Sequence, residues 1–240
     1  GIGEARRLLR VRLACDALAD AGFDYAAADI EAAFLAAGVE HELLHASERD
    51  FTAHGRTVAY LRQIDDEIGD RLDERAWARL DEAILTPMLT HRPVVMKDAH
   101  ETLDAVRAHG LSVGLISNTG ITPGFVLRHI LDDMGLWRLL DHAVFSDEEE
   151  LAKPAVALFE NTLDEMGVAA TEAAFLGDQP RLDVAGALRA GMWSLQIGDV
   201  APIDGVAPHA RIGGLAELLP ALRLLELLPD VSPRAVAGEC

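Results

Sequence analysis

The sequence predicts an α/β protein in which an all-helical segment precedes a parallel sheet covered by helices on both faces. Two observations predict this class. Residues 4 to about 88 show helical periodicity with little strand signal, and after Pro93 short apolar runs alternate with helical stretches. Such alternation is typical of right-handed βαβ units, whose strand carboxyl ends share one edge of the sheet. Ligands of open α/β sheets bind at that edge.

The helical segment forms the first predicted domain, residues 1–91, and should contain four or five helices. Its first helix, in GEARRLLRVRLACDALADAG, is expected to end at Gly22, because glycine favours helix ends. Three more helices are predicted in the stretches DYAAADIEAAFLAAG, RDFTAHGRTVAYLRQIDDEIG and DERAWARLDEAILTPML.

The second predicted domain, residues 92–240, carries the sheet. Strands are expected in the stretches LSVGLIS, HAVFS, AAFLG and MWSLQIG. Helices are expected in DAHETLDAVRAHG, GFVLRHILDDMG, KPAVALFENTLDEMG, RLDVAGALRAG and IGGLAELLPALRLLELL. About the last ten residues are expected to form a loose tail.

Charge and cysteine content argue against several classes of protein. The formal net charge of −19 opposes binding to nucleic acid or to an anionic membrane surface. The two cysteines, Cys15 and Cys240, show no metal-type spacing, so we expect a reducing, cytoplasmic location. No apolar run is long enough to span a bilayer.

Polar residues follow three of the predicted strands. The first strand ends in Ser117-Asn118-Thr119-Gly120, Lys153 follows the second strand, and Asp178 follows the third, with Asp183 in the next helix. Hydroxyl and amide groups, a lysine and an acid pair together suit a phosphoryl group bound with a divalent metal. Lys153 is one of only two lysines among 21 basic residues, which adds weight to its assignment.

Each of these elements also has a purely structural explanation. The Ser117–Gly120 stretch alone resembles a turn or helix cap, a Lys-Pro pair commonly precedes a helix, and the acids could stabilise a helix N-terminus. The functional interpretation depends on their joint order, each element following its own strand.

In that order, the segments LISNTG, AKP and LGDQPRLDVAGALRAGM resemble the second, third and fourth motifs of the haloacid dehalogenase-like hydrolases. The resemblance covers most of residues 93–220 and implies a Rossmann-like core, with the helical domain as its cap. Ala155 departs from the motif, in which Asp often follows Lys-Pro. The resemblance implies an Mg²⁺-dependent phosphatase for a small phosphorylated metabolite.

The resemblance also assigns roles to individual residues. Asp178 and Asp183 would bind Mg²⁺, and Ser117, Asn118, Thr119 and Lys153 would hold the phosphoryl group. Lys153, Asp178 and Asp183 are the expected catalytic residues in this chain.

The nucleophile motif of the family, an apolar strand followed by Asp-x-Asp, has no match in the sequence. The candidates Asp16, Asp20, Asp24 and Asp98 lack a preceding strand or the rest of the motif. The family pattern places this central strand immediately before the cap, and therefore upstream of Gly1. A core lacking it would leave several backbone groups unpaired, at about 1–3 kcal/mol each. We therefore expect an aspartyl-phosphate mechanism whose nucleophile precedes Gly1, and no turnover by residues 1–240.

Alternatives remain at this level. One is a non-catalytic protein of the same fold that binds phosphate or a partner, and another is a 2-haloacid dehalogenase. The metal-type acid pair Asp178 and Asp183 counts against the dehalogenase, which needs no metal. A response-regulator receiver is disfavoured by the large helical insert. His41 and His45 are expected to be a surface pair without a third ligand, and Asp147–Glu150 a solvated loop or a group that raises the pKa of Lys153.

Overall fold

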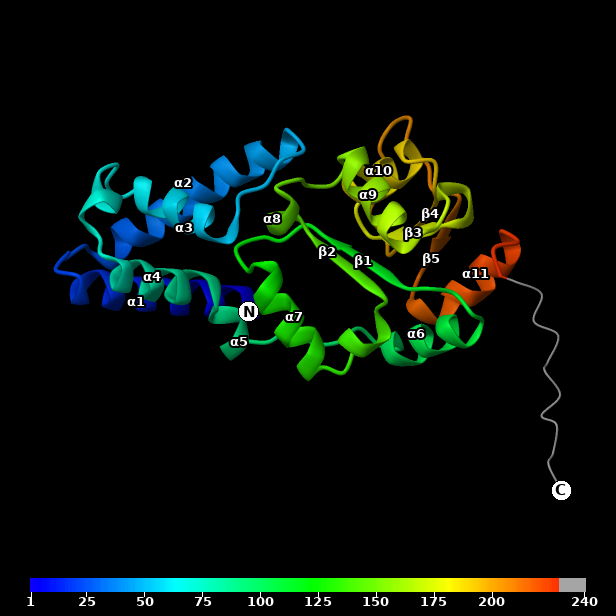
Figure 1. The fold of residues 1–240 in the computed structure, drawn as a ribbon, viewed down its shortest axis with the longest axis horizontal. Coiled ribbons are helices and arrows are strands. Elements are labelled where there is room, and N and C mark those ends of the chain that lie inside the picture. The colour runs from blue at the N-terminus through cyan, green and yellow to red at the C-terminus, as the bar shows by residue number, and fades with distance from the viewer. Residues whose placement is uncertain (229–240) are drawn as a thin grey trace, which may run out of the picture.

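All regular elements of the first ninety residues are helices in the computed structural model, which describes residues 1–228 (Figure 1). They are α1 (Ile2–Asp20), α2 (Ala27–Ala46), α3 (Ala53–Arg62), a 3₁₀ turn (Ile68–Arg71), α4 (Glu74–Leu85) and α5 (Pro87–Thr90). Thr52 and Asp73 cap α3 and α4 by accepting hydrogen bonds from Gly55 N and Ala76 N. Fully buried apolar side chains, among them Leu18, Ile30, Leu80 and Ile84, join these helices through one hydrophobic cluster. We call residues 1–91 the cap and residues 92–228 the core.

The core contains five strands, all parallel to their neighbours, and the predicted α/β class is confirmed. The strands are β1 (Gly114–Ser117), β2 (His142–Phe145), β3 (Ala174–Gly177), β4 (Trp193–Ile197) and β5 (Ala210–Ile212). The helices are α6 (Ala99–Ala108), α7 (Gly124–Asp133), α8 (Ser146–Glu149), α9 (Val156–Met166), α10 (Ala185–Arg189) and α11 (Leu218–Leu224). Short 3₁₀ turns span Trp137–Leu139, Ala170–Glu172 and Leu215–Glu217, and a π-helical turn spans Pro180–Val184.

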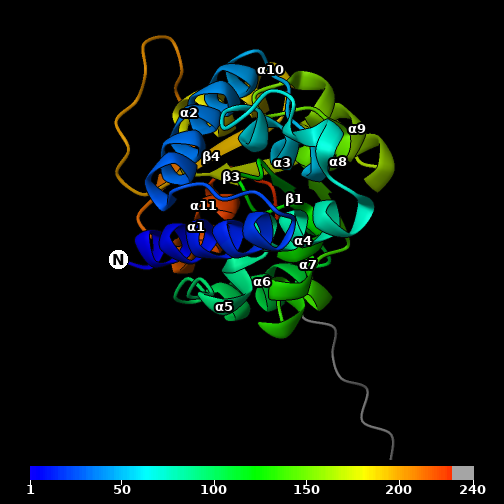
Figure 2. The same cartoon turned by 90° about the vertical axis from the view of Figure 1, so that its left-hand side faces the viewer.

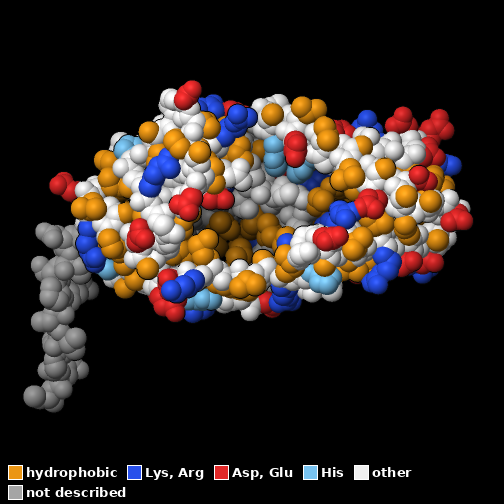
Figure 3. All heavy atoms as spheres, turned by 180° about the vertical axis from the view of Figure 1, so that it is seen from behind, with side chains coloured by type: hydrophobic (Ala, Val, Ile, Leu, Met, Phe, Trp, Pro, Cys, Tyr) orange, Lys and Arg blue, Asp and Glu red, His pale blue; other side chains and the backbone are white. Residues whose placement is uncertain are grey.

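The sheet is divided into two parts. β1 pairs with β2, and β3 pairs with β4, which also pairs with β5; within residues 1–228 no strand joins β1 to β3. A cavity of about 650 Å³ lies between the two parts, lined by residues 114–116 of β1 and 174–177 of β3. Figure 3 shows a hollow in the rear face, with hydrophobic side chains at its bottom. The edges of β1 and β3 that face each other thus line this largely apolar cavity, and we call the space between them the slot.

The C-terminal part of the sheet contains one more strand than the sequence predicts. Strand β5 was not predicted, and Ile212 was assigned to the closing helix; the Gly213-Gly214 pair separates the strand from that helix. β5 pairs with β4 through Ile212 and Ile197, and His209 N donates to Ser194 O beside it. The expected loose tail lies outside the described residues.

The cap and the core meet through backbone as well as side chains. The loop after α2 pairs with the segment before Lys153, where Arg49 and Leu151 form an antiparallel bridge. Asp50 N donates to Glu150 O at 3.2 Å. Seen from the cap end in Figure 2, the cap helices lie in front of the sheet, and Figure 1 places the N-terminus at the boundary between cap and core.

In the described part of the chain, no helix has the length and apolar character needed to cross a membrane.

Candidate active site

Lys153 and Asp183 form a partly buried ion pair at the carboxyl end of the sheet. Lys153 Nζ lies 2.7 Å from Asp183 Oδ1, and their side chains are 12% and 5% exposed. Asp183 Oδ2 accepts a hydrogen bond of 2.9 Å from Gln179 N. Because both oxygens of Asp183 have donors, this carboxylate is held in one orientation.

The π-helical turn Pro180–Val184 brings Asp183 back against the end of β3. π-Helical turns are rare in proteins, and those that occur are often found at functional sites. Asp183 packs directly over Gly177, where an added Cβ would lie 2.3 Å from the Asp183 Cβ and Cγ atoms. A side chain at residue 177 is therefore incompatible with the observed position of Asp183.

Replacing Gly177 by Ala should displace the Asp183 side chain and break its contacts with Lys153 and Gln179. Overpacking of this kind costs about 1–3 kcal/mol. We expect the urea midpoint of the 240-residue chain to fall accordingly, whereas Gly38→Ala, in open space on α2, should leave it unchanged or raise it. An unchanged midpoint in Gly177→Ala would show that this close approach is not required.

Asn118 positions Lys153 by pairing with its backbone. Asn118 Oδ1 accepts from Lys153 N at 2.7 Å, and Asn118 Nδ2 donates to Lys153 O at 3.1 Å. The Lys153 ammonium also lies 5.3 Å from the centre of the Phe175 ring, a favourable cation–π arrangement. Asn118 therefore holds the backbone of Lys153 in place.

The remaining predicted residues lie around the same cavity. Asp178 follows β3 directly and is exposed, and it lines the cavity together with Lys153 and Asp183. Ser117 is the last residue of β1, next to Ile116, which also lines the cavity. The structure thus brings an ammonium and two carboxylates to one opening, beside a hydroxyl-bearing strand end.

Thr119, which is predicted to hold phosphate, contacts other residues of the protein in this structure. Thr119 is 1% exposed, and its backbone N donates to Ser146 Oγ at 2.8 Å. Its Oγ1 donates to Asp147 Oδ1 at 2.9 Å and accepts from Arg56 of the cap. Thr119 therefore holds the loop to its surroundings.

The expectation that the acidic stretch Asp147–Glu150 is solvated was wrong for Asp147. Asp147 is buried at 5% exposure and accepts from Gly124 N as well as Thr119, while Glu148–Glu150 are exposed as expected. The reason is local: Asp147 lies in α8, whose first residue, Ser146, contacts the loop after β1.

A buried network connecting cap and core was missed altogether. Asp50, with a fully buried side chain, accepts from Arg56 Nη2 at 2.8 Å and from Ser146 Oγ at 2.5 Å. Arg56, itself 2% exposed, also donates to Gly120 O and to Thr119. This network ties the loop Ser117–Gly120 to the cap.

The pKa of Asp50 lies well below its ordinary value. Burial acts to raise this pKa, but the adjacent imidazoles of His41 and His45, the Arg56 charge and the Ser146 hydroxyl outweigh it. The expectation that His41 and His45 lack a third ligand was wrong, because the chain turns after α2 and brings Asp50 between them.

The acid pair fits a divalent cation with oxygen preference. Asp178 offers an exposed carboxylate to the cavity, and Asp183 lines the same cavity with its oxygens already engaged by Lys153 and Gln179. Mg²⁺ is commonly held by one or two carboxylates together with water and substrate phosphate. Asp178 would therefore be the direct ligand, and Asp183 would support it.

Comparison with known proteins gives one family. The model of a family described as haloacid dehalogenase-like hydrolase matches residues 8–191. The phosphoserine phosphatase of Thermus thermophilus is 34% identical over 123 residues, which are 50% of this chain and 48% of that protein. The phospholysine phosphohistidine inorganic pyrophosphate phosphatase of Bos taurus is 36% identical over 92 residues, 38% of this chain and 34% of that protein. The chain thus spans half or less of the length of these curated relatives.

Solved structures share the fold. The 2-haloacid dehalogenase from Pseudomonas syringae pv. Tomato DC3000 has a TM-score of 0.63 at 20% identity, with 92% of each chain covered. An uncharacterized protein from Listeria monocytogenes serotype 4b has a TM-score of 0.53 at 28% identity, covering 58% of this chain and 86% of that one. At 20% identity, the likeness to the dehalogenase concerns the fold alone.

Proposed function

The chain belongs to the haloacid dehalogenase-like hydrolases, and on that premise we propose that it carries the active site of an Mg²⁺-dependent phosphatase. Its substrate would be a small phosphorylated metabolite. The observation that carries the proposal is the ion pair of 2.7 Å between Lys153 and Asp183 on the cavity that Asp178 also lines. The phosphatases among the curated relatives support the same reaction class.

Each of these residues has a separate role in the proposed hydrolysis. Lys153, which is held by Asn118 and Asp183, neutralises the non-bridging phosphoryl oxygens. The Ser117 hydroxyl donates a hydrogen bond to one of these oxygens. Bound Mg²⁺ supplies Lewis-acid polarisation of the phosphoryl group. Asp178 holds the cation, and the Asp183 carboxylate keeps the lysine and the turn in place. A unit charge pair at 4 Å is worth about 4 kcal/mol at an effective dielectric near 20, which is the scale of repulsion these cations offset.

We further propose that the nucleophile is an aspartate on a strand in the slot between β1 and β3, contributed by residues preceding Gly1. The slot is apolar, both its walls are strand edges, and the N-terminus lies at the boundary between cap and core (Figure 1). A parallel strand there would pair its backbone groups with both edges. Its terminal aspartate would reach the carboxyl edge and attack phosphorus, which breaks the ester P–O bond, releases the alcohol and leaves an aspartyl-phosphate that water hydrolyses to free aspartate and phosphate.

This proposal predicts different behaviour for two lengths of the protein. Residues 1–240 alone should release no phosphate from phosphorylated metabolites above the buffer rate. The extended chain, by which we mean the protein expressed with the residues encoded upstream of Gly1, should release phosphate in the presence of Mg²⁺. Release by residues 1–240 would contradict the placement of the nucleophile.

The same assay separates the alternatives. Halide release from 2-haloacids by the extended chain, without metal, would indicate a dehalogenase. Binding of phosphate without hydrolysis of any ester would indicate a binding protein. Either result would replace the phosphatase assignment.

A further inference from the structure

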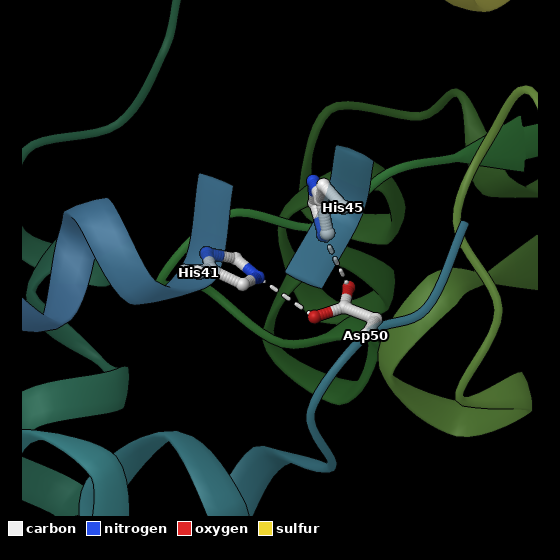
Figure 4. Close-up of side chains that lie close together, drawn as sticks. All are labelled: His41, His45 and Asp50. Carbon is white, nitrogen blue, oxygen red and sulfur yellow. Dashed lines mark hydrogen bonds and ion pairs between the residues drawn. The ribbon is translucent and has the colours of Figure 1, made fainter. Parts of the chain in front are cut away.

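Two histidines and an aspartate converge outside the proposed phosphoryl site (Figure 4). His41 and His45 lie one turn apart near the end of α2, and Asp50 follows in the loop that pairs with the core. His41 Nε2 is 2.7 Å from Asp50 Oδ1, and His45 Nε2 is 3.0 Å from Asp50 Oδ2. One atom of each residue that could bind a metal therefore lies within 4.8 Å of the other two.

His45 is incompletely satisfied in this arrangement. Its Nε2 atom is buried, and although it lies near Asp50 Oδ2 it has no hydrogen-bond partner among the described residues. A buried nitrogen without a partner is costly, and a bound cation would satisfy it. His41, by contrast, forms an aligned hydrogen bond with Asp50.

The spacing suits a transition metal. Zn²⁺ binds histidine nitrogen and carboxylate oxygen at about 2.0–2.2 Å in a tetrahedral site, so neighbouring ligand atoms lie about 3.3–3.6 Å apart. The two nitrogen–oxygen distances here, 2.7 and 3.0 Å, are somewhat shorter, so a bound ion would require the imidazoles to move slightly away from Asp50. Imidazole ligands favour Zn²⁺, Cu²⁺ or Ni²⁺ over Mg²⁺, which distinguishes this cluster from the carboxylates Asp178 and Asp183.

The surroundings hold the carboxylate in place. Arg56 and Ser146 both donate to Asp50 Oδ2, and Phe51 N donates to Oδ1 at 2.7 Å. Carboxylates that bind metals are commonly fixed by such neighbours. The histidine side chains are 14% and 20% exposed, so a cation can reach them from solvent.

We propose that His41, His45 and Asp50 form a transition-metal site that fixes α2 to the following loop, which carries Asp50. The metal binds the Nε2 lone pair of each neutral imidazole, whose proton then resides on Nδ1, so no net proton is released. The bound cation joins α2 to a carboxylate already linked to Ser146 of the core. The proposal does not depend on the phosphatase assignment.

Zn²⁺ titration of the metal-stripped extended chain, with excess Mg²⁺ present to occupy other carboxylates, tests the site. We expect one equivalent bound and a raised melting temperature. His41→Gln and His45→Gln should each weaken binding at least about tenfold. His129→Gln serves as the matched control, because His129 also faces a carboxylate one turn away, Asp133, but is exposed.

A second measurement keeps the test decisive if a variant does not fold. Co²⁺ added to the wild-type chain should give visible absorption characteristic of nitrogen and oxygen ligation, and Zn²⁺ should abolish it. Failure of the wild-type chain to bind either ion stoichiometrically would overturn the proposal. Binding that persists in both folded histidine variants, or is lost equally in His129→Gln, would overturn it as well.

Discussion

Replacing Lys153 by Met in the extended chain is expected to lower kcat for phosphate-ester hydrolysis about 10²–10³-fold. Lys153 is the cation that the chain itself places beside the two carboxylates, with its ammonium held by Asp183 at 2.7 Å. Removing one preorganised group that stabilises transition-state charge typically costs this factor. Steady-state measurement of kcat and KM at saturating Mg²⁺ checks the expectation.

The chain supplies a matched control for this experiment. Lys97, its only other lysine, is exposed at the start of the core, and Lys97→Met should leave kcat unchanged. Lys153→Met also leaves Asp183 without its partner, so the folded fraction should be measured by urea unfolding. A folded Lys153→Met enzyme with wild-type kcat would remove the lysine from the proposed machinery.

Replacing Asp50 by Asn should lower the free energy of unfolding at neutral pH by about 3–5 kcal/mol. The substitution leaves the guanidinium of Arg56, 2% exposed, without its counter-charge, and weakens the contacts of Ser146 and His41. Urea unfolding of the 240-residue chain measures the loss. A change below about 1 kcal/mol would mean that the network adds little to stability.

The effect of Asp50 should depend on pH in a defined direction. The pKa of Asp50 is lowered in the folded chain, so its stabilisation is complete above the unfolded value near 4. The contribution is lost as the pH falls below that value toward the folded pKa. The difference between wild type and Asp50→Asn should therefore shrink below about pH 4.

A double variant separates the charge from the packing. Asp50→Asn combined with Arg56→Met removes both members of the buried pair, and such replacements are often close to neutral. The double variant should therefore recover part of the stability lost in Asp50→Asn. If it is less stable than Asp50→Asn alone, the hydrogen bonds of Arg56 to Gly120 and Thr119 outweigh the charge pair.

The sequence predicted the polar residues that follow three of the strands. Lys153, Asp178 and Asp183 were expected together because parallel strands end at one edge, and the structure places all three on one cavity. The close approach of Asp183 to Gly177 arises from a π-helical turn, which local periodicity did not indicate. Strand β5 is only three residues long, too short for a reliable alternating pattern.

The network around Asp50 could not be predicted for a different reason. Asp50 meets Ser146 across 96 residues of sequence, and Arg56 meets Thr119 across 63. Periodicity identifies the buried face of a helix, but it does not identify which polar group of another domain faces it. The sequence therefore offered no reason to connect Asp50 or Arg56 with Thr119, which was expected to hold phosphate.

The most direct test of the account is the Mg²⁺ dependence of phosphate release by the extended chain, compared with its Asp178→Asn variant. We predict release that stops when the metal is chelated, and a kcat at least about 100-fold lower in Asp178→Asn, because removing a single charge-stabilising group has cost this much in other enzymes. Asp132→Asn, on the exposed surface of α7, should behave as wild type. Phosphate release that persists without metal, or is unaffected by Asp178→Asn, would contradict the proposed site.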